Sequence, residues 1–181
     1  HKIGADVDQV TGAVSLATDR LISGAYLSGG MGDGGGCHPR DNIAMSWLAR
    51  KLDLSHDFFE DLMLAREHQT EWLADLIEEN SNGLPIVILG KSFKPETNIQ
   101  TGSPSILLKN ILEERKIKSS IFDPYVDPKE DRPTGTAVYF IGTKHPDFAT
   151  YDFAEGSIII DPWRYIPDKE NVKIIRIGEK K

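Results

Sequence analysis

Residues 85–90, Pro-Ile-Val-Ile-Leu-Gly, are the first of five short apolar runs in the second half of the chain. A run of this length, rich in β-branched side chains and ended by Gly, is typical of a strand buried on both faces of a parallel sheet. Similar runs lie at residues 119–123, 136–141, 157–161 and 173–177. Together the five runs predict a mainly parallel sheet.

The segment between the first two runs predicts a crossover helix. Ser103-Pro104 suits a helix start, and apolar residues recur on one face up to about Arg115. Strands and helices repeated in this order are the pattern of a parallel sheet with crossover helices. The second half of the chain therefore predicts an α/β fold.

The first half of the chain has a helical pattern. Asp6 suits the N-cap of a first helix, whose imperfect apolar stripe runs to Leu21. A second helix is predicted over about residues 40–52, and a third begins at Ser55 or Asp57.

The third helical pattern stops at Asn80-Ser-Asn-Gly83, where the composition changes from helical to strand-rich. This change predicts a boundary near residues 82–84. We expect a helical segment over residues 1–82 and a sheet domain over residues 83–181.

The composition limits the classes of partner. Of the 181 residues, 39% are hydrophobic and 27% charged, as in an ordinary globular protein. The formal net charge of −7, without any long basic run, argues against nucleic acid or anionic lipid as a partner. The apolar runs are far shorter than the ~20 residues of a membrane helix, so no membrane span is predicted. A single cysteine, Cys37, excludes an intramolecular disulfide, and we expect a cytoplasmic protein.

Cys37 follows the most glycine-rich stretch of the chain. Seven of the sixteen glycines lie between Gly24 and Gly36, which predicts a loop that delivers Cys37 to the start of a helix. The positive end of a helix stabilises a thiolate, the reactive form of cysteine, and Asp41 one turn later can position a water. Alternatively, Cys37 is a small buried residue and the loop only a tight connection. The five histidines show no metal-ligand spacing, so no metal is predicted.

Two basic residues are expected at the edge of the sheet where ligands of open α/β sheets bind. Lys94 follows the first strand in Gly90-Lys-Ser-Phe-Lys-Pro, and Arg164 follows the fourth in Asp161-Pro-Trp-Arg. Cationic side chains at this edge suit an anionic ligand such as a diphosphate, although Lys94 could be an ordinary solvated charge. Asp123-Pro124 follows the second strand and is either a binding acid or a turn.

Several motifs, in this order, resemble the C-terminal half of the UDP-glucose/GDP-mannose dehydrogenase family, the nucleotide-sugar 6-dehydrogenases. Gly30-Met-Gly-Asp-Gly-Gly-Gly-Cys-His-Pro-Arg-Asp41 fills the family pattern Gly-x-Gly-x-Gly-Gly-x-Cys-x-Pro-x-Asp. The segment after the first predicted strand fills Gly-x-x-Phe-Lys-Pro, and Ser103-Pro104 and Asp123-Pro124 follow. The resemblance implies a helical dimerisation segment followed by a Rossmann-like, sugar-nucleotide-binding sheet domain.

The resemblance also implies an activity, the oxidation of a sugar C6 alcohol to a carboxylate with two NAD. Cys37 would be the nucleophile that holds the aldehyde as a thiohemiacetal and then a thioester, and Asp41 would help to activate the hydrolytic water. The implied nucleotide-sugar contacts are Tyr26, Leu27, Ser28, Gly32, Gly34, Phe93, Lys94 and Arg164. The residues implied against the nicotinamide end of NAD are Cys37, His38, Pro39 and Arg40.

The chain departs from the family pattern at two positions. Thr101 and Leu21 stand where the family usually has arginines, although Arg20 is one residue away. The glycines of residues 30–35 follow no predicted strand and cannot serve as a dinucleotide fingerprint. We therefore expect NAD to be bound mainly by a domain outside this chain, and the chain to be inactive alone.

Two other functions are alternatives. One is a stand-alone sugar-nucleotide-binding or dimerisation module without catalysis. The other is a small cysteine hydrolase that uses Cys37 with His38 or Asp41. Because His38 is the next residue, it is poorly placed to reach back as the base.

Overall fold

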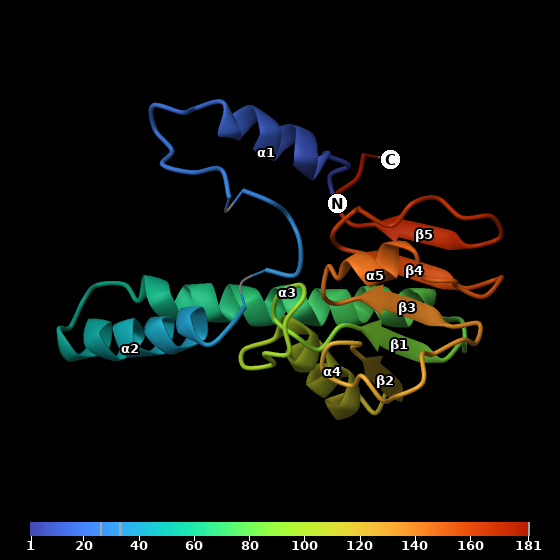
Figure 1. Ribbon diagram of the computed structural model, residues 1–181. Coiled ribbons are helices and arrows are strands. Elements are labelled where there is room, and N and C mark those ends of the chain that lie inside the picture. Colours follow the sequence, from blue (N-terminus) through green and yellow to red (C-terminus); the bar gives the residue numbers. More distant parts are fainter. Residues whose placement is uncertain (26, 33, 181) are drawn as a thin grey trace.

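Figure 1 shows the computed structural model of the chain, which describes residues 1–25, 27–32 and 34–180. A parallel sheet lies at one end, and a pair of helices projects away from it. In chain order the elements are α1 (Val7–Ser15), α2 (Cys37–Lys51), α3 (Phe58–Ser81), β1 (Ile86–Leu89), α4 (Pro104–Glu114), β2 (Ser119–Phe122), β3 (Val138–Ile141), α5 (Pro146–Ala149), β4 (Ile158–Asp161) and β5 (Lys173–Arg176).

The sheet confirms the predicted α/β fold. Its strands have the order β2-β1-β3-β4-β5, and every neighbouring pair is parallel. All residues of β1, β3 and β4 are buried, because these strands are covered on both faces. Each strand lies within its predicted run. Because all neighbouring strands are parallel, the carboxyl ends of all five lie at the same edge of the sheet.

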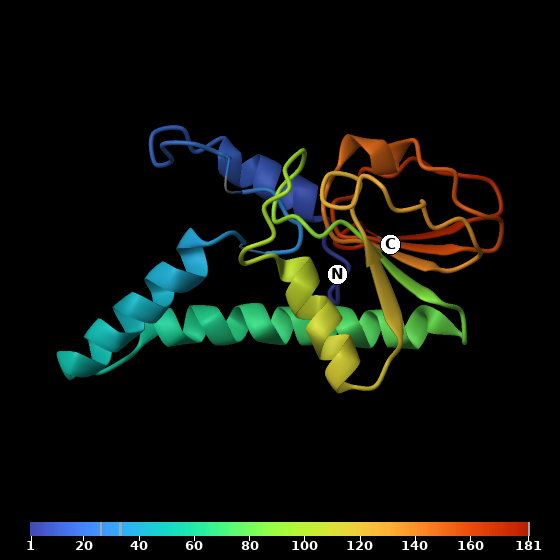
Figure 2. The ribbon, with the colours of Figure 1, turned by 60° about the horizontal axis from the view of Figure 1, so that its bottom comes forward.

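One face of the sheet is covered by helices, as Figure 2 shows for α3 and α4. Leu73 and Ile77 of α3 and Leu112 of α4 pack in one buried cluster with Phe140 of β3 and Ile160 of β4. Burial of each such side chain contributes roughly 1.5–3 kcal/mol. Of these two helices, α4 is the predicted crossover between β1 and β2, whereas α3 precedes the first strand.

The other face is covered mainly by aromatic side chains. The expectation of repeated crossover helices is wrong beyond α4, because α5 has four residues and the β2–β3 and β4–β5 connections are loops. Phe148, Tyr151 and Phe153, from the β3–β4 connection, are buried there, and the Phe153 ring lies 5.1 Å from the Tyr139 ring of β3. These large rings bury enough surface to cover this face of the sheet without a long helix.

The 24-residue helix α3 belongs to both halves of the molecule. Its N-cap is Asp57, whose Oδ1 accepts from Glu60 N at 3.0 Å and whose Oδ2 accepts from Ser46 Oγ of α2 at 2.6 Å. The start of α3 therefore pairs with α2, and its C-terminal half enters the core of the sheet domain. The boundary predicted near residues 82–84 falls at the end of this shared helix.

The helix α1 stands apart from the main core (Figure 1). Asp6 caps it as predicted, accepting from Gln9 N at 2.9 Å, but the helix ends at Ser15 and not near Leu21. No residue of α1 is buried, and its apolar stripe is open to solvent. Because Val10, Val14 and Leu16 are exposed, their burial does not stabilise a longer helix.

Candidate functional site

A cavity of about 580 Å³ lies at the carboxyl edge of the sheet. Three segments far apart in the sequence enclose it: the glycine loop before α2, the loop after β1 and the turn after β4. Its lining residues are Ala25, Ser28, Gly29, Gly30, Gly32, Gly34, His38, Gln69, Phe93, Lys94 and Trp163. The cavity therefore joins the two sequence motifs that were predicted to bind a ligand.

Trp163 forms one wall of the cavity and was not among the site residues predicted from the sequence. Its Nε1 donates to Ile141 O at 3.0 Å, and its backbone N donates to Asp161 Oδ1 at 2.9 Å. The ring lies directly against Gly30, where an added Cβ would stand 2.1 Å from a ring carbon. Trp163 thus ties the ends of β3 and β4 to the glycine loop, and its place inside the Asp161–Arg164 motif was the available signal.

Gly35 and Phe93 make a second close contact between the two motifs. Gly35 has φ +85°, and a Cβ there would stand 2.9 Å from the Phe93 ring. Only glycine combines this backbone conformation with this approach. The glycine loop is therefore shaped to pack against the loop that carries Phe93 and Lys94.

Gln69 of α3 also lines the cavity, and no sequence signal marked it. It lies in the middle of a predicted helix, and its side chain reaches the backbone at Gly32. Only the folded chain brings α3 beside the glycine loop, so its position depends on tertiary packing.

Cys37 is the first residue of α2 and is exposed. The alternative that Cys37 is a small buried residue is therefore wrong. The helix begins three residues before the predicted start at 40, with Gly36 as its N-cap. His38, the next residue, lines the cavity, so Cys37 is adjacent in sequence to a lining residue and stands at the positive end of a helix.

Asp41 is paired with its neighbour Arg40. Arg40 Nε lies 2.8 Å from Asp41 Oδ1, and both side chains are more than half exposed. The hydrogen bond from Arg40 holds the pKa of Asp41 below its ordinary value. Asp41 is therefore an ionised carboxylate one helical turn after Cys37.

Arg164 is not among the lining residues of the cavity, but it contacts Gly29, which is. Its side chain is only 8% exposed, and Nε and Nη2 each lie 2.8 Å from an oxygen of Asp8 in α1. Nη2 also donates to Gly29 O, and Nη1 donates to the carbonyls of Ile177 and Pro162. The five guanidinium N–H groups are thus used within the protein, and the pairing lowers the pKa of Asp8.

The structure brings together part of the predicted site. Ser28, Gly32, Gly34, Phe93, Lys94 and His38 line the cavity. Cys37, Pro39, Arg40 and Asp41 lie along the start of α2 beside it, and Leu27 lies in an adjoining hollow with Ser28. Tyr26 lies outside the described residues.

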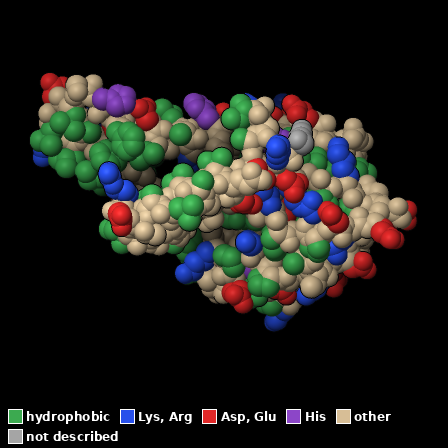
Figure 3. Space-filling view, turned by 90° about the horizontal axis from the view of Figure 1, so that it is seen from above, with side chains coloured by type: hydrophobic (Ala, Val, Ile, Leu, Met, Phe, Trp, Pro, Cys, Tyr) green, Lys and Arg blue, Asp and Glu red, His purple; other side chains and the backbone are tan. Residues whose placement is uncertain are grey.

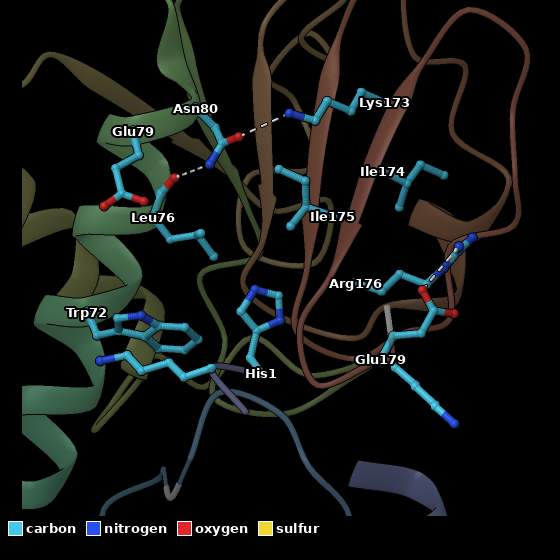
Figure 4. A pocket seen from close by; sticks show the side chains of 12 residues that line it. His1, Trp72, Leu76, Glu79, Asn80, Lys173, Ile174, Ile175, Arg176 and Glu179 are labelled. Atoms are coloured by element: carbon cyan, nitrogen blue, oxygen red, sulfur yellow. Dashed lines mark hydrogen bonds and ion pairs between the residues drawn. The ribbon is translucent and has the colours of Figure 1, made fainter. Parts of the chain in front are cut away.

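Figure 4 shows a second hollow, of about 660 Å³, between α3, β5 and the first two residues. Two of its polar side chains have partners within the protein: Lys173 Nζ donates to Asn80 Oδ1 at 3.2 Å, and Asn80 Nδ2 donates to Leu76 O at 2.9 Å. None of the motif residues discussed above lines it. The 580 Å³ cavity is therefore the candidate functional site.

In the described part of the chain, no group of three or more His, Cys, Asp or Glu side chains could hold a metal ion. Among the described helices, none has the length and hydropathy to cross a membrane.

Gly30→Ala is expected to lower the free energy of unfolding by about 1–3 kcal/mol, because the added methyl overlaps the Trp163 ring. Urea unfolding measures the loss. The control is Gly135→Ala, where an added Cβ meets nothing within 4 Å. Equal stability of the two variants would show that the Gly30–Trp163 contact is not tight.

Comparison with known proteins identifies the family. Residues 1–67 match the UDP-glucose/GDP-mannose dehydrogenase family, central domain. The UDP-glucose 6-dehydrogenase TuaD of Bacillus subtilis is 26% identical over 177 residues, which are 96% of this chain and 37% of TuaD. The GDP-mannose 6-dehydrogenase of Azotobacter vinelandii is 30% identical over 128 residues, 71% of this chain and 29% of that enzyme.

A solved structure shares the fold. The UDP-glucose dehydrogenase of Pyrobaculum islandicum superposes with a TM-score of 0.83 at 22% identity, over 99% of this chain and 45% of that one. The chain spans less than half the length of each of these relatives. The chain belongs to the UDP-glucose/GDP-mannose dehydrogenase family.

Proposed function

We propose that the chain is part of a nucleotide-sugar 6-dehydrogenase and that the 580 Å³ cavity holds the nucleotide sugar. The observation that carries this proposal is the meeting of Lys94, the glycine loop and Trp163 in one cavity at the carboxyl edge of a parallel sheet. The names of the relatives, UDP-glucose and GDP-mannose 6-dehydrogenases, support the same substrate class.

The cavity offers the three kinds of contact that a nucleotide sugar needs. Lys94 supplies a positive charge for the diphosphate. The backbone of the glycine loop lines the cavity at residues 29, 30, 32 and 34, where its polar groups can contact phosphate or sugar oxygens. Phe93 and Trp163 offer aromatic surface to a base or a sugar ring.

Cys37 is the proposed nucleophile. Its exposed thiol, at the first residue of α2, can add to the C6 aldehyde and hold it as a thiohemiacetal and later as a thioester. The paired, ionised Asp41 one turn along would orient the water that hydrolyses the thioester. The two oxidations that lead from alcohol to thioester need a hydride acceptor, which we propose is NAD.

The sheet of this chain does not fit the pyrophosphate of NAD. In dinucleotide-binding α/β folds the pyrophosphate lies at the start of the helix that follows the first strand. In this chain that helix is α4, and Ser103, Pro104 and Ser105 at its start are buried. The β1–α4 connection also has no Gly-x-Gly-x-x-Gly pattern. We propose that this chain offers NAD only the surface of Cys37, His38, Pro39 and Arg40, and that the cofactor is bound mainly by residues beyond those described.

Calorimetric titration of the purified chain with UDP-glucose and GDP-mannose tests the proposal. Lys94→Met is expected to weaken binding roughly tenfold or more, because a charge-assisted contact is worth about 1.5–3 kcal/mol. Lys129→Met is the control. It removes an exposed lysine of the β2–β3 connection that is not among the cavity's lining residues, and it should bind as the wild type. Failure of the folded wild type to bind either ligand would overturn the proposal.

We further propose that α2 and the start of α3 form a dimer interface with a second copy of the chain. Figure 3 shows hydrophobic side chains gathered on this projecting end of the molecule. The exposed apolar residues there are Ile43, Met45, Trp47, Leu52, Leu54, Phe58, Leu62 and Leu64. A contiguous apolar surface of this kind marks an interaction site.

A further inference from the structure

His145 and Asp123 form a buried pair outside the cavity. Neither side chain has exposed surface, and His145 Nε2 lies 3.1 Å from Asp123 Oδ2. Asp123 directly follows β2, and His145 lies in the connection after β3. The pair is therefore placed at the carboxyl edge of the sheet, against residues 91–96 of the loop that follows β1.

The hydrogen bonds of His145 define which ring nitrogen carries the proton. The backbone N–H of Glu96 donates to His145 Nδ1 at 3.1 Å, so Nδ1 must present a lone pair. The proton of the neutral ring is therefore on Nε2. There it faces two acceptors, Asp123 Oδ2 and Ser92 Oγ, each at 3.1 Å.

Ser92, His145 and Asp123 have the residue types of a hydrolytic triad but not its geometry. In a triad the serine and the carboxylate bind different ring nitrogens, whereas here both lie on Nε2. The Ser92 hydroxyl is buried and donates to Lys94 O at 3.1 Å. The three residues thus hold a loop and have no access to a substrate.

Further hydrogen bonds join the loop after β1 to residues that directly follow β2 and β3, the two strands beside β1. Asp123 Oδ2 accepts from the backbone amides of Lys91 at 2.7 Å and Ser92 at 2.9 Å. Thr143 Oγ1, after β3, donates to Ser92 O at 2.6 Å. The backbone on either side of Phe93 and Lys94 is therefore anchored to residues from β2 and β3.

We propose that His145 and Asp123 are positioning residues that hold the loop after β1 so that Phe93 and Lys94 face the nucleotide-sugar cavity. This inference rests on the proposed function of the cavity. Lys94 is an exposed side chain, and its placement depends on the backbone that carries it. A loop ordered before the ligand arrives spares the entropy that ordering it would cost on binding.

The test combines amide hydrogen exchange with calorimetric titration of UDP-glucose and GDP-mannose. In His145→Ala, the amides of Lys91, Ser92 and Glu96 are expected to exchange roughly tenfold faster relative to those of β3. The affinity for the nucleotide sugar that the wild type binds should fall by about tenfold in parallel.

Two further variants separate positioning from general stability. His145→Gln can place an N–H near the position of Nε2, so Lys91 and Ser92 should stay protected while the Glu96 amide is freed. Leu112→Ala removes a buried side chain on the opposite face of the sheet, so loop and strand amides should shift together and the affinity of the folded protein should stay unchanged.

The inference is overturned if the loop amides of His145→Ala change only in step with those of β3, or if the loop loosens without loss of affinity. Failure of the proposed function has a different signature, since the wild type itself would then bind neither ligand. A failure of the positioning role alone would leave wild-type binding intact.

Discussion

Asp123→Asn is expected to lower the free energy of unfolding by about 2–6 kcal/mol, although the two side chains have nearly the same shape, because each of two or more buried N–H donors left without an acceptor costs about 1–3 kcal/mol. Both carboxylate oxygens of Asp123 accept hydrogen bonds from N–H donors: Oδ2 from Lys91, Ser92 and His145, and Oδ1 from Tyr125 at 2.8 Å and Val126 at 3.3 Å. In either orientation, the amide group of Asn would therefore point its own N–H groups at two or more donors.

The same interactions predict an acid-dependent loss of stability. Burial alone would raise the pKa of Asp123, but hydrogen bonds from His145 and from the amides of Ser92, Lys91 and Tyr125 outweigh it and hold the pKa well below 3.8. The folded state thus binds this proton less readily than the unfolded chain. The stabilisation is present above about pH 4 and is lost as the pH falls below that value.

Urea unfolding at a series of pH values measures both effects. The wild type should lose stability below about pH 4, and Asp123→Asn should show a flatter profile there. Asp168→Asn is the control, because Asp168 pairs with Arg176 at 2.6 Å but is 90% exposed, and it should change stability by less than about 1 kcal/mol. An Asp123→Asn variant as stable as this control would refute the role of the buried pair.

The strands were predictable because each is a short apolar run. Residues at β1, β3 and β4 are buried on both faces, so hydrophobicity alone marks them, and parallel pairing follows from their spacing. The covering of the second face was not predictable in this way. Phe148 of the four-residue helix α5 and Tyr151 just after it cover that face, and so short a segment leaves no periodic pattern in the sequence.

The site was predictable where its residues lie in compact motifs. Phe93 and Lys94 line the same cavity as the glycine loop, and the family resemblance had implied both segments as contacts of one ligand. The partner of Arg164 was not predictable, since Asp8 lies 156 positions away and only tertiary packing joins them. Gln69 was missed for the same reason.

From the sequence, Asp123 has two possible roles, a binding acid or a turn residue. The structure decides for a structural role, because Asp123 accepts from the backbone of its own turn, at Tyr125, and from that of a neighbouring loop, at Ser92. A carboxylate with this many internal donors has no free lone pair directed at the cavity. The sequence showed its position at the strand end but not its partners.

Trp47→Lys is expected to convert a dimer into a monomer. Trp47 is 61% exposed on α2, and its apolar neighbours Ile43 and Leu52 are about equally exposed, which is unusual for three large side chains on one short surface. Tryptophan at the centre of an interface commonly contributes about 2 kcal/mol or more, so its loss should weaken association roughly thirtyfold. A buried lysine charge adds a desolvation cost to that loss.

Sedimentation over a dilution series distinguishes the two states, because the dimer has twice the 20.1 kDa of one chain. Ile3→Lys is the matched control: it also replaces an exposed apolar residue, 90% exposed, but it lies outside the α2–α3 end and should leave the dimer intact. A monomeric wild type would refute the interface. A dimer that persists in Trp47→Lys but dissociates in Ile3→Lys would also refute it. The interface would then include Ile3, and the apolar surface of α2 would be exposed in the dimer.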